Sequence, residues 1–140
     1  LVINAIDVDT QPDINIDIIG VGSSPYDILR EQEIDNLHGV NFAAGTTKTD
    51  ASEKFQMRNV RAAAWWSMRE SLDPVTGDNI TLPPGGELLA DLTSACWKLT
   101  VSGIQIESKD DIKKRIGRSP DVGDAVVLAN YIDGSWLFDF

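Results

Sequence analysis

The stretch from Ile14 to Leu29 constrains the fold most strongly, because a strand, a glycine turn and a helix follow one another there. Isoleucines alternate with polar residues over Ile14–Ile19, which predicts a strand with one apolar face. Gly20 and Gly22 follow, and glycine enters tight turns and positive φ without steric cost. The pattern is typical of an α/β protein in which a crossover helix joins parallel strands.

The helix after the glycines has a recognisable beginning. Ser24 suits the N-cap, Pro25 the first helical position, and Asp27 a capping-box acid. Asp17 then lies near the carboxyl end of the strand, the edge where open α/β sheets bind ligands. The two glycines also permit a nucleotide-binding interpretation, but the loop lacks a third glycine and a Gly-Lys-Ser/Thr ending. A tight turn is therefore favoured.

The remaining pattern predicts an α/β fold with a mixed sheet flanked by helices. A second strand at 38–44 should pair in parallel with the first. A helix at 55–72 should place Trp65 and Trp66 in the core or at a partner contact. The chain should continue with a helical turn at 87–92, a hairpin of strands 93–101 and 104–107, a helix at 109–116, and a closing helix from Asp121 to about Tyr131.

Composition narrows the class of protein. The 140 residues suit a single domain, and 22 acids against 12 bases give a net charge of −10. Such a charge argues against strong independent binding of nucleic acid. No apolar run reaches the roughly 18 residues of a membrane span. The single Cys96 excludes an internal disulfide, favours a cytoplasmic location and is expected to be buried.

Acidic residues supply the candidate site. Asp121 and Asp124 lie three residues apart, on one face of the closing helix, with Val122, Ala125, Val126 and Ala129 on the face expected to pack on the sheet. Two acids in a first turn also complement the helix dipole, and that interpretation stays open. Together with Asp17 they could hold Mg²⁺, which prefers few carboxylates plus waters and phosphate oxygens. Two such ions roughly 3.5–4 Å apart would suit phosphodiester hydrolysis.

Basic residues gather in one place. The cluster consists of Lys109, Lys113, Lys114, Arg115 and Arg118. It is either a solvated helix face or a patch that contacts phosphates. In the second case Lys109, Lys113 and Arg118 are the expected DNA contacts.

Several sequence blocks are informative as an ordered set. They are 16–22 (Ile-Asp-Ile-Ile-Gly-Val-Gly), 26–30 (Tyr-Asp-Ile-Leu-Arg), 39–42 (Gly-Val-Asn-Phe), 61–70 (Arg-Ala-Ala-Ala-Trp-Trp-Ser-Met-Arg-Glu) and 106–125, which begins Ile-Glu-Ser-Lys and ends Arg-Ser-Pro-Asp-Val-Gly-Asp-Ala. Together they resemble the nuclease domain of the large terminase subunit of tailed bacteriophages.

The resemblance implies a ribonuclease-H-like fold and a metal-dependent endonuclease that cuts double-stranded DNA during genome packaging. It implies Mg²⁺ or Mn²⁺ as cofactor, held by Asp17, Asp121 and Asp124, with either helix acid as the principal ligand. The implied partners are DNA, the terminase ATPase domain and the portal protein. The implied location is the cytoplasm of a bacterial host.

The sequence departs from the family in one respect. Members carry a first strand, with its own acid, upstream of the segment that matches Leu1–Ile6, and this chain begins at Leu1. We therefore expect a piece of a larger protein, or a prophage remnant, with weak or no cleavage. The alternative is an inactive protein-interaction module that binds a packaging protein through its acidic surface or its Trp136–Phe140 tail.

Overall fold

The computed structural model describes residues 12–20, 23–34 and 36–132. The tail at 136–140, to which one binding hypothesis refers, lies outside these residues. The elements in chain order are β1 (Ile14–Asp17), α1 (Ser23–Glu31), β2 (Leu37–Val40), α2 (Val60–Ser71), α3 (Gly86–Ser94), β3 (Trp97–Thr100), β4 (Gly103–Ile106), α4 (Lys109–Ile116) and α5 (Asp121–Asn130).

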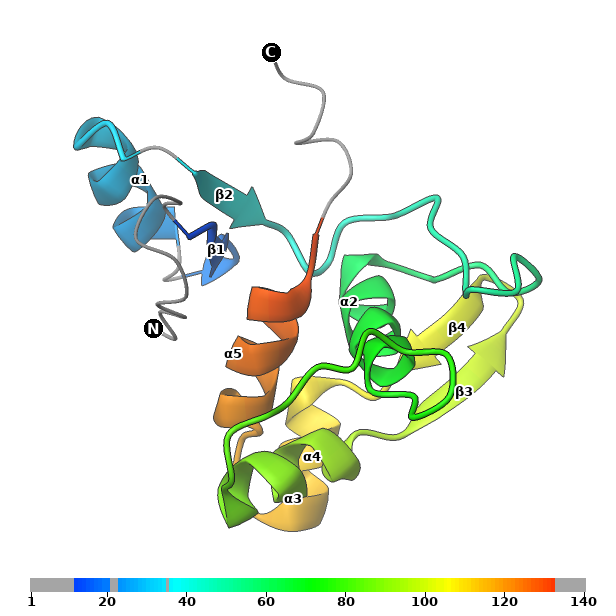
Figure 1. Ribbon diagram of the computed structural model, residues 1–140. Coiled ribbons are helices and arrows are strands. Elements are labelled where there is room, and N and C mark those ends of the chain that lie inside the picture. Colours follow the sequence, from blue (N-terminus) through cyan, green and yellow to red (C-terminus); the bar gives the residue numbers. More distant parts are fainter. Residues whose placement is uncertain (1–11, 21–22, 35, 133–140) are drawn as a thin grey trace.

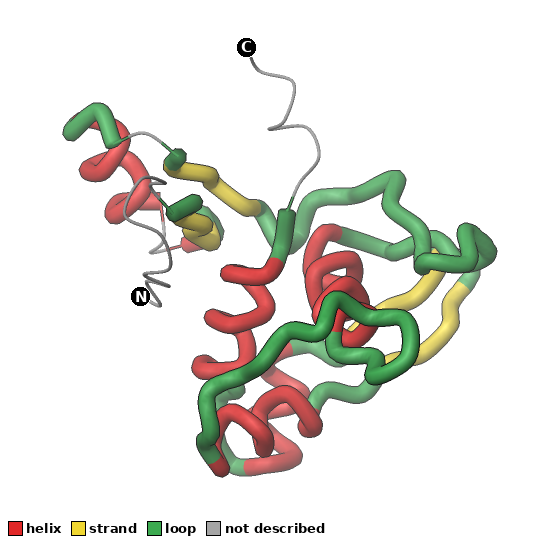
Figure 2. The backbone as a smooth tube through the Cα atoms, in the orientation of Figure 1, coloured by secondary structure: helices red, strands yellow, loops and turns green. Residues whose placement is uncertain are grey.

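The described strands form two separate pairs rather than one mixed sheet (Figure 2). β1 and β2 are parallel, with Ile14 opposite Leu37 and Asp17 opposite Val40. β3 and β4 form the expected antiparallel hairpin, but its first strand begins at Trp97 because residues 93 and 94 belong to α3. Helices α2 and α5 lie between the two pairs (Figure 1). The chain is thus mixed α/β, and helix packing joins its two small sheets.

The second strand is shorter than predicted because the chain turns after Val40. The amide of Ala44 donates to the carbonyl of Asn41, which closes a turn. The carbonyls of Phe42 and Ala44 then accept hydrogen bonds from Arg61 and Val60, at the start of α2. Residues 42–44 therefore satisfy the free amides of a helix instead of extending the sheet.

Helix α2 begins five residues later than predicted, since residues 56–58 pair with β4. The amide of Ile104 donates to Gln56 and the amide of Arg58 donates to Ile104. Asn59 then caps the helix by accepting from the amide of Ala62 at 2.9 Å. Trp65 and Trp66 are both buried, so the core interpretation of these tryptophans is confirmed.

Helix α4 begins and ends where the sequence predicts. The Ser108 hydroxyl accepts from the amide of Asp111, and Gly117 ends the helix with a φ of 83°. Ile112 is fully buried on its inner face. The exposed Cys96 contradicts its predicted burial, because it precedes β3, whose residues 97–99 all face solvent.

The face that helix α5 presents to the core matches the prediction only in part. Gly123 and Val127 are its buried residues, and Val126 packs against the core as predicted. Val122 is 38% exposed, and Ala125 and Ala129 also face solvent. The helix is rotated this way because the Asp124 side chain points inward and accepts hydrogen bonds from α2. The C-terminal end of α5 is fixed to β1, since the Asn15 amide donates to the carbonyls of Leu128 and Tyr131, each at 2.8 Å.

None of the helices in the described part of the chain combines the length and apolar character that crossing a bilayer requires.

Candidate functional site

The two helix acids meet at one ammonium group. Lys109 is the first residue of α4, and its long side chain reaches the first turn of α5. The Nζ atom of Lys109 lies 2.7 Å from Oδ1 of Asp121 and 3.4 Å from Oδ2 of Asp124. The Ser119 hydroxyl also donates to Asp121, at 2.9 Å. A single cation thus bridges the two predicted metal ligands.

Two side chains of α2 donate hydrogen bonds to the Asp124 carboxylate. Its Oδ1 accepts from Nη1 of Arg61 at 2.6 Å and from the indole N–H of Trp65 at 3.2 Å. The side chains of Asp124 and Arg61 are 12% and 13% exposed. This leaves Oδ2 of Asp124 on the side of Lys109 and Asp121. Arg61 and Trp65 orient the carboxylate, and sequence reasoning missed both.

The Arg61 guanidinium occupies an aromatic setting. It lies 5.9 Å from the ring of Phe42 and 5.4 Å from that of Trp65. Its Nε and Nη2 atoms are buried and make no hydrogen bond. Buried donors without partners are destabilising, but an apolar residue at position 61 would remove the charge that pairs with the largely buried Asp124 carboxylate. The spacing of Arg61 to Trp65, one helical turn on α2, is the only sequence signal that pointed to the pair.

The charges around Lys109 shift two pKa values. The hydrogen bond from Lys109, helped by that from Ser119, holds the pKa of Asp121 below its usual value. Partial burial acts to lower the pKa of Lys109, but its contacts with Asp121 and Asp124 outweigh burial and raise that pKa. Both shifts favour the charged pair over the neutral one.

Asp17 does not join this pair in a three-carboxylate cluster. It lies at the end of β1, and its Oδ1 accepts from the amide of Ile19 at 3.1 Å. Among the residues placed by the structure, no three acidic, histidine or cysteine side chains gather closely enough to hold a metal ion. The expected convergence of all three acids is therefore not seen in this part of the chain.

The three residues predicted to contact DNA differ in whether their side chains are already engaged in ion pairs within the chain. Lys109 is engaged by the acid pair. Arg118 lies 2.5 Å from the buried Asp91 and 3.8 Å from Glu87. Lys113 is exposed on the outer face of α4. Of the three, Lys113 best keeps the exposed position expected of a phosphate contact.

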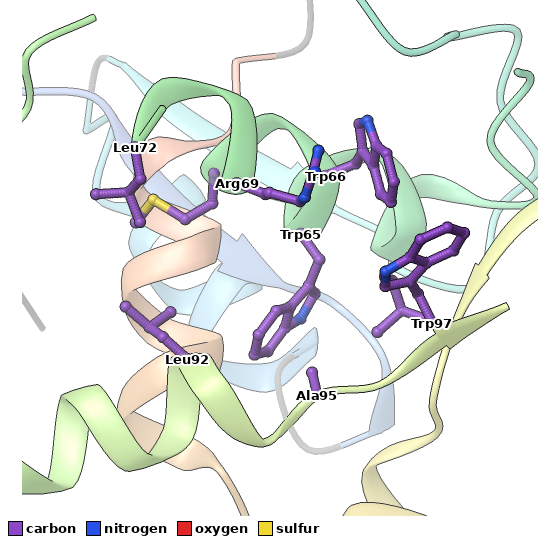
Figure 3. Close-up of a pocket in the computed structure, with 9 residues that line it drawn as sticks. Trp65, Trp66, Arg69, Leu72, Leu92, Ala95 and Trp97 are labelled. Atoms are coloured by element: carbon purple, nitrogen blue, oxygen red, sulfur yellow. The ribbon is translucent and has the colours of Figure 1, made fainter. Parts of the chain in front are cut away.

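Trp65 also lines a pocket of about 130 Å³ (Figure 3). Its lining comes from α2, α3 and the hairpin, and includes Trp65, Trp66, Leu92 and Trp97. The rings of Trp66 and Trp97 meet edge to face at 5.1 Å. The guanidinium of Arg69 lies 4.6 Å from the centre of the Trp66 ring. Trp65 therefore contributes its indole N–H to the acid site and its ring to this pocket.

Comparison with solved structures gives the fold a known counterpart. The chain is similar to a lysine-to-alanine variant of the nuclease domain of the large terminase subunit gp2 of bacterial virus Sf6, with manganese and beta-thujaplicinol, at a TM-score of 0.64 and 17% identity. The same variant with manganese matches at a TM-score of 0.60 and 18% identity. The matches cover 86% and 85% of this chain but 65% of each viral chain.

The chain thus has the fold of a bacteriophage terminase nuclease domain and spans about 65% of the length of the viral chains it matches. No protein-family profile matches the sequence, and no curated protein sequence matches it.

Proposed function

We propose that the chain is a ribonuclease-H-like nuclease domain of a DNA-packaging terminase, which cuts double-stranded DNA by metal-dependent phosphodiester hydrolysis. One observation carries the proposal. In a fold shared with a terminase nuclease domain, two carboxylates one helical turn apart are bridged by an ammonium group. The positive charge of Lys109 already lies between the two carboxylates. A divalent cation bound there would neutralise the same two negative charges.

The residues present fit one hard cation. Asp121 and Asp124 would hold Mg²⁺ or Mn²⁺ in place of the Lys109 ammonium group. Such an ion, when bound, supplies positive charge that stabilises the phosphodiester under attack. The described acids do not offer a third carboxylate for a second ion. We therefore propose weak cleavage by this chain alone, with Asp17 as a separate carboxylate at the sheet edge.

The chain's own residues have distinct tasks in this proposal. Arg61 and Trp65 donate hydrogen bonds to Oδ1 of Asp124. The carboxylate is thereby oriented with Oδ2 toward Lys109. Lys109, once displaced from the acids, is placed to bind a DNA phosphate. Lys113 adds a second phosphate contact from the exposed face of α4. Because the net charge is −10, we propose that partner domains supply most of the affinity for DNA. The proposed partners are the terminase ATPase domain and the portal protein.

Nicking of supercoiled plasmid in Mn²⁺ tests the proposal. We expect Asp124→Asn and Asp121→Asn to abolish nicking, while Asp110→Asn, an exposed acid on α4, serves as the matched control and leaves it unchanged. Cleavage by Asp124→Asn at the rate of the unaltered chain would reject the site. Asp17→Asn separates two versions: full activity indicates a two-acid site, and loss indicates that Asp17 joins it when DNA binds.

DNA binding offers an independent check. Lys113→Ala should weaken binding to a duplex and reduce the slope of log affinity against log salt by about 1, as expected for one lost phosphate contact. Lys54→Ala, an exposed lysine in a loop, is the control. Fluorescence anisotropy at several salt concentrations measures both. Equal slopes for the two variants would remove α4 from the DNA interface.

A second candidate function is an inactive interaction module. The aromatic pocket favours it, since Trp97, which lines the pocket, is 54% exposed. Calorimetric titration with Mn²⁺ separates the two functions. Binding that Asp124→Asn abolishes supports the nuclease, and absence of carboxylate-dependent binding supports the module.

A further inference from the structure

A buried carboxylate lies beneath the first turn of α5. Asp91, in α3, is fully buried. Its Oδ2 accepts a hydrogen bond of 3.0 Å from the amide of Gly123, and its Oδ1 forms an ion pair with Arg118 without hydrogen-bond geometry. Burying a charge is unfavourable unless partners compensate it. An acid at this position therefore has a cost that an apolar residue of similar size would not have.

The two helices meet there almost backbone to backbone. A Cβ atom added to Gly123 would lie 2.7 Å from Cβ of Asp91 and 3.3 Å from its carbonyl carbon. No side chain fits in that gap, so α5 rests on α3 at a fixed depth. Gly123 immediately precedes Asp124, whose carboxylate meets Arg61 and Trp65 on the neighbouring side of the helix.

We infer that Asp91 is a positioning residue for the acid pair. It touches neither Asp121 nor Asp124 through any contact described above. It acts by holding the Gly123 amide and the Arg118 side chain, which fixes how the first turn of α5 faces α2 and Lys109. The inference rests on the proposed function only for its consequence, which is the binding of a divalent ion by that pair.

The indole N–H of Trp65 reports this arrangement without metal or DNA, since it donates to Asp124. In a ¹H–¹⁵N spectrum, its peak is identified by its disappearance in Trp65→Phe. In Asp91→Asn, which keeps the side-chain shape and removes the charge, we expect the Trp65 peak to move toward its position in Asp124→Asn. We also expect Mn²⁺ affinity to fall roughly tenfold, as for residues that orient metal ligands.

Leu88→Ala is the matched control, because Leu88 is a buried residue of the same helix. It should lower the melting temperature and leave the Trp65 peak in place. A purely structural role for Asp91 would make the two variants alike. An unmoved Trp65 peak in folded Asp91→Asn therefore overturns the inference, whether or not the chain binds Mn²⁺ or cuts DNA.

Arg118→Gln is the second variant, used if Asp91→Asn does not fold. It removes the charge that faces Asp91 from a side chain that is 39% exposed, so the fold is less at risk. The same displacement of the Trp65 peak supports the inference. Unfolding of both variants overturns it, since the pair would then be required for the fold as a whole.

Discussion

The two halves of the molecule are packed very differently. In the unit β1–α1–β2, α1 has no buried residue and the four residues of β1 are only partly covered. In the half built by α2, β4, α4 and α5, the side chains of Ala62, Ile112 and Val127 are fully buried. Asn15 joins the two halves through its hydrogen bonds to the end of α5.

This difference separates the predicted site residues. Asp121 and Asp124 belong to the well-packed half, where Arg61, Trp65 and Asp91 fix them. Asp17 belongs to the sparsely packed half and bonds only its own neighbouring turn in the contacts described. Local opening is easiest where few apolar contacts are buried. We therefore expect the acid pair to persist when the β1–β2 unit opens.

A pair of isoleucine substitutions, one in each half, tests the difference most strongly. Ile104 is 1% exposed and Ile28 is 55% exposed. Ile104→Ala should lower the free energy of unfolding by about 2–5 kcal/mol, because it removes buried methyl groups and leaves a cavity. Ile28→Ala should change it by less than about 0.5 kcal/mol. Urea unfolding measures both, with Ile104→Val as the milder replacement if the first variant does not fold. Similar values would mean that the halves are equally packed.

Removal of the connection between the halves should have an intermediate effect. Asn15→Ala removes the two hydrogen bonds from β1 to the carbonyls of Leu128 and Tyr131, and we expect a loss of about 1–3 kcal/mol. Hydrogen exchange should then speed up in β1 and β2 and stay slow in α2. Uniform acceleration across both sheets would show that the chain unfolds as one unit.

The smallest predicted effect concerns pH. The pKa of Asp121 is lowered in the folded state by Lys109, so this contact stabilises the fold above the ordinary carboxyl pKa and the contribution is lost as the pH falls through the lowered value. In Lys109→Met the pKa of Asp121 should rise toward its ordinary range in a ¹³C carboxyl titration. Since Asp121 is 71% exposed, the loss of stability at neutral pH should be a few tenths of a kcal/mol. An unchanged titration would place Lys109 away from Asp121 in solution.

The elements that could be predicted are those whose boundaries depend on residues nearby in the sequence. Helix α4 follows from Ser108 and Gly117, and the hairpin follows from its turn. The start of α2 was missed because residues 56–58 pair with Ile104, far along the chain. The inward position of Asp124 on α5 was missed for the same reason, since its partner Arg61 lies 63 residues away along the chain. Asp91 carries no local signal, because a buried acid in a short helix resembles an exposed one in sequence.

Titration with Mn²⁺, followed through the tryptophan indole peaks, tests the central claim most directly. Paramagnetic broadening falls steeply with distance from the ion, and the Trp65 indole N–H lies 3.2 Å from Oδ1 of Asp124. We expect the Trp65 peak to broaden at lower Mn²⁺ than the peaks of the other three tryptophans, and Asp124→Asn to abolish this order. Equal broadening of all the indole peaks, or an unchanged order in Asp124→Asn, would contradict a cation site between the two acids of α5.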